Sequence, residues 1–303
     1  MLLSGLPWEG MSAEPAVIER DRNLVRTLLS ERGRAVVRLR RRLLERGEAE
    51  TIHDLRVATR RLEAALGALA DRVPDRERAR LERRSRKIRR CLQKERNAWV
   101  MLALLKELKG LMSADEIEGV AKLKRRLKET ARAGRRPSSR RRRHGIPSIG
   151  PRLREVLRAL DPGRTAWPEH LARARLGARL RELLPACETA RTGGVEEMHR
   201  LRIAIKSYRY MLEVLVEAGL PRLGARVRQA RSMQQALGEL HDLDVLIESV
   251  KRETGAWASK RLLPRLRGLR TGRLERARRS IARFQRGEAA HGLEALVGGR
   301  AVS

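Results

Sequence analysis

The chain has 303 residues, of which 41% are hydrophobic, and its 70 Lys and Arg residues outnumber 37 Asp and Glu residues to give a formal net charge of +33 at pH 7. This hydrophobic content predicts a folded core, and no apolar stretch approaches the ~20 residues that a membrane-spanning helix needs. Because a charge of this size opposes compaction unless an anion offsets it, the expected partner is a polyanion.

The predicted elements are all helices, because strong helix formers dominate and aromatic residues make up only 2% of the chain. In the first half the apolar periodicity predicts helices over about residues 16–46, 52–70, 76–108 with a break near Lys94, and 114–133. Six arginines among helix breakers then indicate a linker. In the second half helices are predicted over about 171–190, 196–218, 221–254 and 259–286.

This layout predicts an all-α fold of two antiparallel helical bundles of about four helices each, related by an internal pseudo-twofold duplication around a basic central groove. The expected divisions are an N-terminal extension (1–15), a first bundle repeat (16–133), an Arg-rich linker or loop (134–150), a second bundle repeat (151–290) and a C-terminal tail (291–303). The oligomeric state stays open. The two cysteines, Cys91 and Cys187, lack metal-type spacing, so we expect buried or idle thiols and no disulfide.

A histidine motif supports the duplication, since it occurs in both halves at residues 53–60 (HDLRVATR) and 199–206 (HRLRIAIK). At about 100° per residue, helix offsets 0, 3 and 7 lie within roughly 60° of one another, so one face carries a histidine, an arginine and a further cation. The opposite face carries an apolar stripe that is expected to face the core: Leu55, Ala58, Leu62, Leu66 and Leu69 in the first copy, and Leu201, Ala204, Tyr208, Leu212 and Leu215 in the second. An ordinary solvated charged face explains either copy alone, but the pair favours a functional interpretation.

The kind of anion is indicated by the side chains that dominate. Arginine heavily outnumbers lysine, and its planar guanidinium binds phosphate oxygens in a bidentate manner. Single-strand nucleic-acid binders use aromatic side chains to stack bases, and this chain has only four Trp, two Tyr and one Phe. Tyr208 lies on the apolar stripe and Tyr210 near the basic face. The sequence therefore favours phosphate without bases, although duplex binding through the backbone stays open.

Residues 53–62 and 199–213 resemble the two signatures of the CHAD domain, the conserved histidine α-helical domain, and residues 237–245 (LGELHDLDV) resemble a third segment of that family. The resemblance covers about residues 16–290 and implies paired helical bundles around a basic channel that binds inorganic polyphosphate. Carried over by position, the implied binding residues are His53, Arg56, Arg60, Arg61, His199, Arg202, Lys206 and Arg209. Two positions depart from the family pattern: Glu63 replaces a basic residue, and Trp99 replaces an aspartate in residues 92–100, the first-half counterpart of residues 237–245.

We expect a binding protein and not an enzyme, with no cofactor and no metal. It is expected in the cytoplasm, where polyphosphate granules would hold it. One alternative is a metal-dependent phosphohydrolase or a phosphohistidine phosphotransfer enzyme acting on polyphosphate, since His-Asp pairs occur at His53 and His241. A complete ligand set is hard to assemble, and for Asp242 and Asp244 we favour interhelical ion pairs over metal binding. A second alternative is nonspecific nucleic-acid binding through an Arg-rich surface that includes residues 140–143.

Overall fold

The computed structural model describes residues 15–133, 145–160, 169–254 and 256–291, and within these ranges it is helical without strands. The expectation of an all-α fold is therefore confirmed. Most of the Arg-rich linker, nearly all of the N-terminal extension and nearly all of the C-terminal tail lie outside the described residues. None of the described helices is both long and apolar enough to cross a bilayer.

The long helices follow the predicted ones closely, with bounds that differ by a few residues. The described α-helices are α1 (Pro15–Arg46), α2 (Ala49–Ala68), α3 (Asp75–Cys91), α4 (Gln93–Glu107), α5 (Ala114–Gly119), α6 (Ala121–Ala133), α8 (Gly150–Ala159), α9 (Glu169–Thr192), α10 (Val195–Glu217), α11 (Gly224–Glu253) and α12 (Ala256–His291). The predicted helix over 76–108 is divided at Leu92, two residues from the expected break. Helix α8 was not predicted, because ten residues carry too short a periodic pattern to distinguish from a loop.

Two glycines with positive φ set the directions of the motif helices α2 and α10. Gly47, at φ 67°, follows α1 and lets the chain reverse so that α2 packs along α1. Gly219, at φ 103°, does the same between α10 and α11. Only glycine adopts this left-handed region without a steric penalty, so each reversal occurs directly at the helix end.

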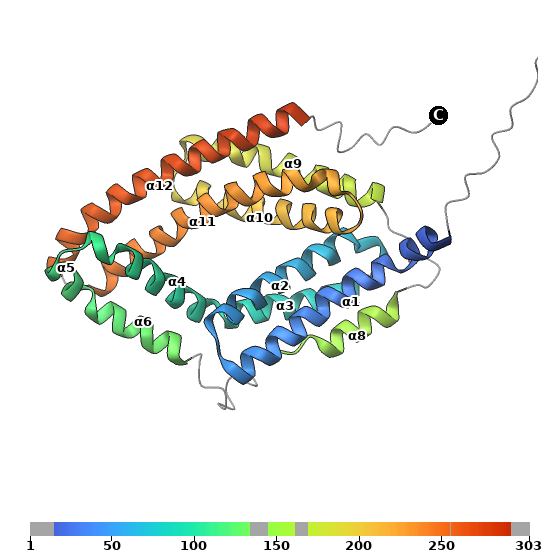
Figure 1. Ribbon diagram of the computed structural model, residues 1–303, viewed down its shortest axis with the longest axis horizontal. Coiled ribbons are helices and arrows are strands. Elements are labelled where there is room, and N and C mark those ends of the chain that lie inside the picture. The colour runs from blue at the N-terminus through green and yellow to red at the C-terminus, as the bar shows by residue number, and fades with distance from the viewer. Residues whose placement is uncertain (1–14, 134–144, 161–168, 255, 292–303) are drawn as a thin grey trace, which may run out of the picture.

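The helices form two neighbouring groups joined by a third (Figure 1). Helices α1, α2, α3 and α8 pack together, α9 packs on α10, and α11 packs on both α10 and α12. Helices α4, α5 and α6 meet the far end of the long α11–α12 pair, and α2 packs on α10 between the two main groups. The two motif helices are thus neighbours.

Some helices pack across the expected division into residues 16–133 and 151–290, and that division stays a prediction. Helix α8 belongs by sequence to the second range but packs on α1 and α3, and its Leu153 and Val156 join their core. Helices α4 and α6 belong to the first range but share a separate hydrophobic core with α11 and α12, in which Leu104, Leu123 and Leu246 are buried. Helices that are close in sequence therefore do not always pack on one another. The internal duplication stays a prediction.

The apolar stripes of the motif helices face the main core as expected. Leu55, Leu62 and Leu66 of α2 and Leu201 and Tyr208 of α10 are fully buried. Ala204 is partly buried against the same core. Burial of apolar surface stabilises the fold by about 25 cal/mol per Å². Each stripe therefore fixes the rotation of its helix about the helix axis, and the cationic face of the helix points away from the core. Cys187 is buried and Cys91 exposed, and both are free thiols.

Candidate anion-binding site

A cavity of about 810 Å³ lies between the motif helices α2 and α10, with α3, α4, α9 and α11 completing its wall. Its lining is dominated by basic side chains, and the carboxylates in it are those of Glu63 and Glu82. The basic side chains are His53, Arg56 and Arg60 of α2, Arg78, Arg86 and Arg89 of α3, Arg96 of α4, Arg179 of α9, His199, Arg202 and Lys206 of α10, and His241 of α11. The cavity is therefore strongly electropositive.

Six of the eight binding residues implied by the family resemblance line this one cavity. They are the two histidine motifs at offsets 0, 3 and 7: His53, Arg56, Arg60, His199, Arg202 and Lys206. The remaining two, Arg61 and Arg209, do not line it. The helical spacing of the motif therefore coincides with the wall of the cavity.

Arg61 and Arg209 both pair with the buried carboxylate of Glu213 instead. The Nε of Arg61 lies 3.2 Å from Glu213, the Nη1 of Arg209 donates to the other carboxylate oxygen, and the Nη2 of Arg231 on α11 lies 3.7 Å away. Arg209 also donates to Gln234 on α11 at 2.8 Å. These arginines hold α2, α10 and α11 together, so their geometry is that of a structural cluster.

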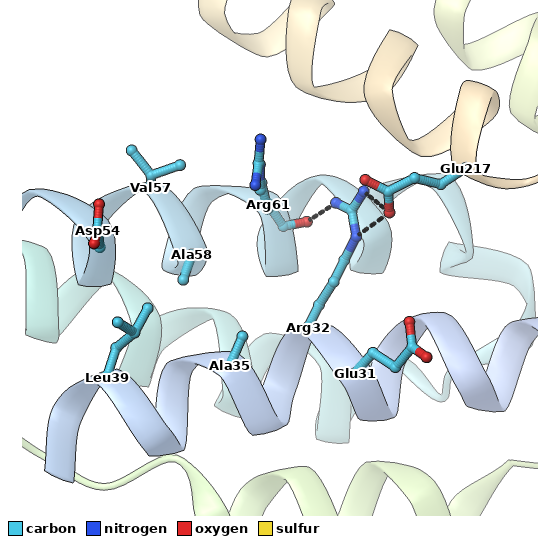
Figure 2. A pocket seen from close by; sticks show the side chains of 9 residues that line it. All are labelled: Glu31, Arg32, Ala35, Leu39, Asp54, Val57, Ala58, Arg61 and Glu217. Atoms are coloured by element: carbon cyan, nitrogen blue, oxygen red, sulfur yellow. Dashed lines mark hydrogen bonds and ion pairs between the residues drawn. The ribbon is translucent and has the colours of Figure 1, made fainter. Parts of the chain in front are cut away.

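Figure 2 shows a second, smaller pocket of about 350 Å³ between α1 and α2, which Arg61 helps to line. There the buried guanidinium of Arg32 on α1 donates to both the carboxylate of Glu217 on α10 and the backbone carbonyl of Arg61, at 2.6 Å each. Apolar side chains such as Val57 and Leu39 line the rest, together with the carboxylates of Glu31 and Asp54. This pocket lacks the concentration of cations that marks the larger cavity.

Arg56 is held rigidly at the wall of the larger cavity. Its Nη1 donates to the backbone carbonyl of Arg89 at 2.6 Å and its Nη2 to the side chain of Gln93 at 2.7 Å, and the residue is only 7% exposed. Burial, followed by the charges of Arg60 and Arg96, lowers its pKa to about 10. The guanidinium stays charged at neutral pH, and its position is fixed before any ligand arrives.

Arg202 and Arg89 present buried N–H groups that lack a hydrogen-bond partner. They are the Nε of Arg202 and the Nη1 of Arg89. Burial lowers the pKa of Arg202 to about 10, and the carboxylate of Asp242 opposes that shift. A buried donor left unpaired costs about 1–3 kcal/mol.

Lys206 is the most strongly perturbed cation in the cavity. Burial, followed by the charges of Arg202, Arg60 and Arg96, lowers the pKa of its amine to about 6, against the attraction of Asp242. At neutral pH the amine is therefore largely unprotonated in the free protein. An anion bound beside it would reverse the repulsion and favour the ammonium form.

His241 is a member of the cavity that the motif did not predict. Its ring centroid lies 5.2 Å from that of His199, with the two planes tilted by 38°. Burial, followed by the charge of Arg202, lowers the pKa of His241 to about 4. The neutral imidazole still offers one N–H donor, and binding of an anion would favour its charged form.

Comparison with known proteins now identifies the family. The family model described as the CHAD domain matches residues 27–251, a range that contains every residue lining the cavity. The chain belongs to the CHAD domain family.

Two solved structures have the same fold as this CHAD chain. The crystal structure of the CHAD domain from the plant Ricinus communis is 22% identical, with a TM-score of 0.58, and the match covers 91% of this chain and 90% of that one. PptA from Streptomyces chartreusis is 18% identical, with a TM-score of 0.64, over 88% of this chain and 99% of that one. No curated protein matches the chain.

Asp242 and Asp244 of this CHAD chain pair with arginines. Asp242 lies 3.1 Å from Arg96 on α4, and Asp244 lies 2.5 Å from Arg270 on α12. The expected interhelical ion pairs are thus confirmed. Within the described residues, no three His, Cys, Asp or Glu side chains come together as metal ligands would. Glu63, at the position where the family pattern has a basic residue, pairs with Arg89 at 2.8 Å, and burial raises its pKa.

The CHAD cavity contains further cations that the sequence analysis missed, and each carried a detectable signal. Residues 78, 82, 86 and 89 repeat at helical spacing, so one face of α3 presents three arginines and a glutamate. Arg96 and His241 occupy equivalent positions in the two related segments 92–100 and 237–245. Treating that second pair of segments like the histidine motif would have placed both residues at the site.

Proposed function

We propose that this CHAD chain binds inorganic polyphosphate in the cavity between α2 and α10. The observation that carries the proposal is that the histidine, arginine and lysine side chains of both motifs line one cavity together with Arg78, Arg86, Arg89 and Arg96. A linear phosphate chain carries repeated nonbridging oxygens that such donors bind strongly. Its negative charge would also relieve the repulsion that lowers the pKa of Lys206.

The shape and lining of the cavity favour polyphosphate over nucleic acid. Apart from its histidines, the cavity wall has one aromatic side chain, Tyr210, so it offers no series of platforms for stacked bases. A duplex, whose major groove alone is about 12 Å wide, would have to remain outside a space of about 810 Å³. A single phosphate chain fits within it.

We also propose that the chain binds this polymer without cleaving it. The described cavity gathers guanidinium groups, an amine and imidazoles, while its carboxylates pair with arginines, Glu63 with Arg89 and Glu82 with Arg78 and Arg86. Hydrolysis of a phosphoanhydride usually needs a positioned base or metal ligands around the attacked phosphorus. Incubation with end-labelled polyphosphate and divalent metals tests this directly: the chain length should stay constant and no acid-labile phosphoprotein should form.

The binding proposal is tested by a salt titration of polyphosphate affinity. Replacing Arg60, Arg202 and Lys206 by Gln removes three cavity cations, so the slope of log K against log salt should become shallower by about 2, using about 0.7 per released counterion as for single strands. Arg56 is left in place because Arg89 and Gln93 accept its hydrogen bonds.

The charge-matched control changes three exposed cations that do not line the cavity: Arg34, Arg38 and Lys128. It should keep a slope close to that of the wild type. An equal loss in both variants would place the binding on the general surface. Failure of long polyphosphate to displace duplex DNA at matched phosphate concentration would overturn the proposal. In cells, the wild type should join polyphosphate granules and the cavity variant should not.

A further inference from the structure

Lys206 differs from the other cations of the cavity because it is the one lysine among the described residues that line it. Its side chain lines the cavity and faces charged or titratable groups from four helices: Arg60 of α2, Arg96 of α4, Arg202 of its own helix α10, and His241 and Asp242 of α11. The carboxylate that attracts its amine, that of Asp242, is bound by Arg96 at 3.1 Å. The amine is thus left without a counterion among cations.

This setting leaves the amine with a free lone pair at neutral pH. The pKa of Lys206 is lowered to about 6 by burial and by the surrounding arginines, whereas only about one ordinary lysine in a thousand is unprotonated at pH 7.5. Unprotonated amines are nucleophiles. The cavity therefore combines a nucleophilic amine with guanidinium groups that bind phosphate.

We propose that Lys206 is an acylation site for acyl phosphates, whose phosphate group is held by Arg60, Arg96 and Arg202 while the Lys206 amine attacks the acyl carbon. The amine nitrogen forms a bond to that carbon, and the carbon–oxygen bond to phosphate breaks. The nitrogen loses one proton, which leaves with the departing group as hydrogen phosphate. The products are an uncharged amide on Lys206 and inorganic phosphate, and no oxidant, metal or further reactant takes part.

Acylation would act as a regulator of the same cavity, and this consequence rests on the proposed binding of polyphosphate. The amide cannot accept a proton when an anion arrives, so one cation is lost and the acyl group occupies part of the cavity. Polyphosphate affinity of the acetylated protein should fall at least tenfold relative to the unmodified protein. The modification itself needs only the cavity and its arginines.

The test uses the full chain, acetyl phosphate at pH 7.5 and peptide mapping after cleavage at glutamate. The peptide of residues 198–213 contains Lys206 as its only lysine, and that of residues 254–275 contains the exposed Lys260 as its only lysine. Lys206 should be acetylated about tenfold faster than Lys260, because a far larger fraction of its amine is unprotonated. Excess pyrophosphate should protect Lys206 and leave Lys260 unaffected.

A second reagent, N-acetoxysuccinimide, distinguishes phosphate capture from simple reactivity. It acylates amines but carries no phosphate, so the preference for Lys206 should shrink. An equal preference with both reagents, or equal rates at Lys206 and Lys260 with acetyl phosphate, would overturn the proposal. An Arg202→Gln variant, checked for helix content, should no longer be acetylated faster at Lys206 with acetyl phosphate than with N-acetoxysuccinimide. If this variant does not fold, the comparison of the two reagents on the wild type still tests the proposal.

The two proposals fail separately. If Lys206 is not acetylated while the salt titration locates polyphosphate in the cavity, acylation alone is wrong. If Lys206 is acetylated selectively and protected by pyrophosphate while polyphosphate does not bind, the cavity serves a smaller phosphate compound.

Discussion

The neutral amine of Lys206 makes polyphosphate affinity depend on pH in a direction that can be worked out. In the free protein the pKa of Lys206 is about 6, and a bound phosphate chain raises it. Binding therefore takes up a proton wherever the free amine is neutral and the bound one is charged. Affinity should rise as pH falls from the bound-state pKa towards about 6 and level off below it.

The size of this effect follows from linkage. Between pH 8.5 and 6.5 the affinity should rise about 20-fold if the bound-state pKa is ~8, and about 75-fold if it returns to the ordinary lysine value, or roughly 1.8 and 2.6 kcal/mol. Replacing Lys206 by Gln removes this contribution and leaves the part that histidine protonation supplies. Replacing the exposed Lys260 by Gln should leave the profile unchanged.

The measurement is a titration of long-chain polyphosphate by calorimetry or anisotropy at several pH values and one fixed ionic strength. Calorimetry in buffers of different ionisation enthalpy also reports the protons taken up directly. A wild-type affinity that changes less than twofold over this range would refute the reasoning. So would a Lys206→Gln variant with the pH profile of the wild type.

Three further predictions concern single residues. Lys206→Met should raise the free energy of unfolding, measured in urea without ligand, by up to ~4 kcal/mol at pH 7.5. The reason is that lysine in the unfolded chain holds a proton that the folded amine releases. A destabilised variant would contradict the lowered pKa of the buried amine. Arg60→Gln should weaken polyphosphate binding about tenfold. Arg61→Gln, next to it in sequence but outside the cavity, should change the affinity less than twofold. Equal effects would show that the helix face on which the arginine lies does not matter. Glu213→Gln should lower the free energy of unfolding by about 3 kcal/mol because it leaves buried arginines without their carboxylate. Glu275→Gln, which removes an exposed ion pair, should lower it by only ~0.5 kcal/mol. Similar values in both variants would contradict the structural cluster.

The helices were predictable because each long one carries an apolar stripe that its own sequence shows. The stripe through Leu55, Leu62 and Leu66 fixes both the existence of α2 and the face that it buries. Helix α8 was missed because its buried residues Leu153 and Val156 span little more than one turn. Its packing on α1 depends on surfaces more than 100 residues away, which no local pattern reveals.

The site was predictable where its residues share one helix face and not where they come from different helices. Arg60 and Arg61 are adjacent in sequence, but about 100° of rotation separates them on the helix, so one lines the cavity and the other meets Glu213. The resemblance assigned both to binding. The cations of α3 and α4 reach the cavity through tertiary packing, and the spacing within the histidine motif contains no information about them.

The separate core that α4 and α6 share with α11 and α12 has a consequence for how the chain is made. During synthesis the apolar faces around Leu104 and Leu123 leave the ribosome more than 100 residues before Leu246 and Leu266, which finally cover them. Until then those faces are exposed, and Arg96 lacks Asp242, its partner across the same junction. We therefore expect that the first 133 residues do not finish folding alone, and that a chain truncated before α11 exposes this surface and aggregates.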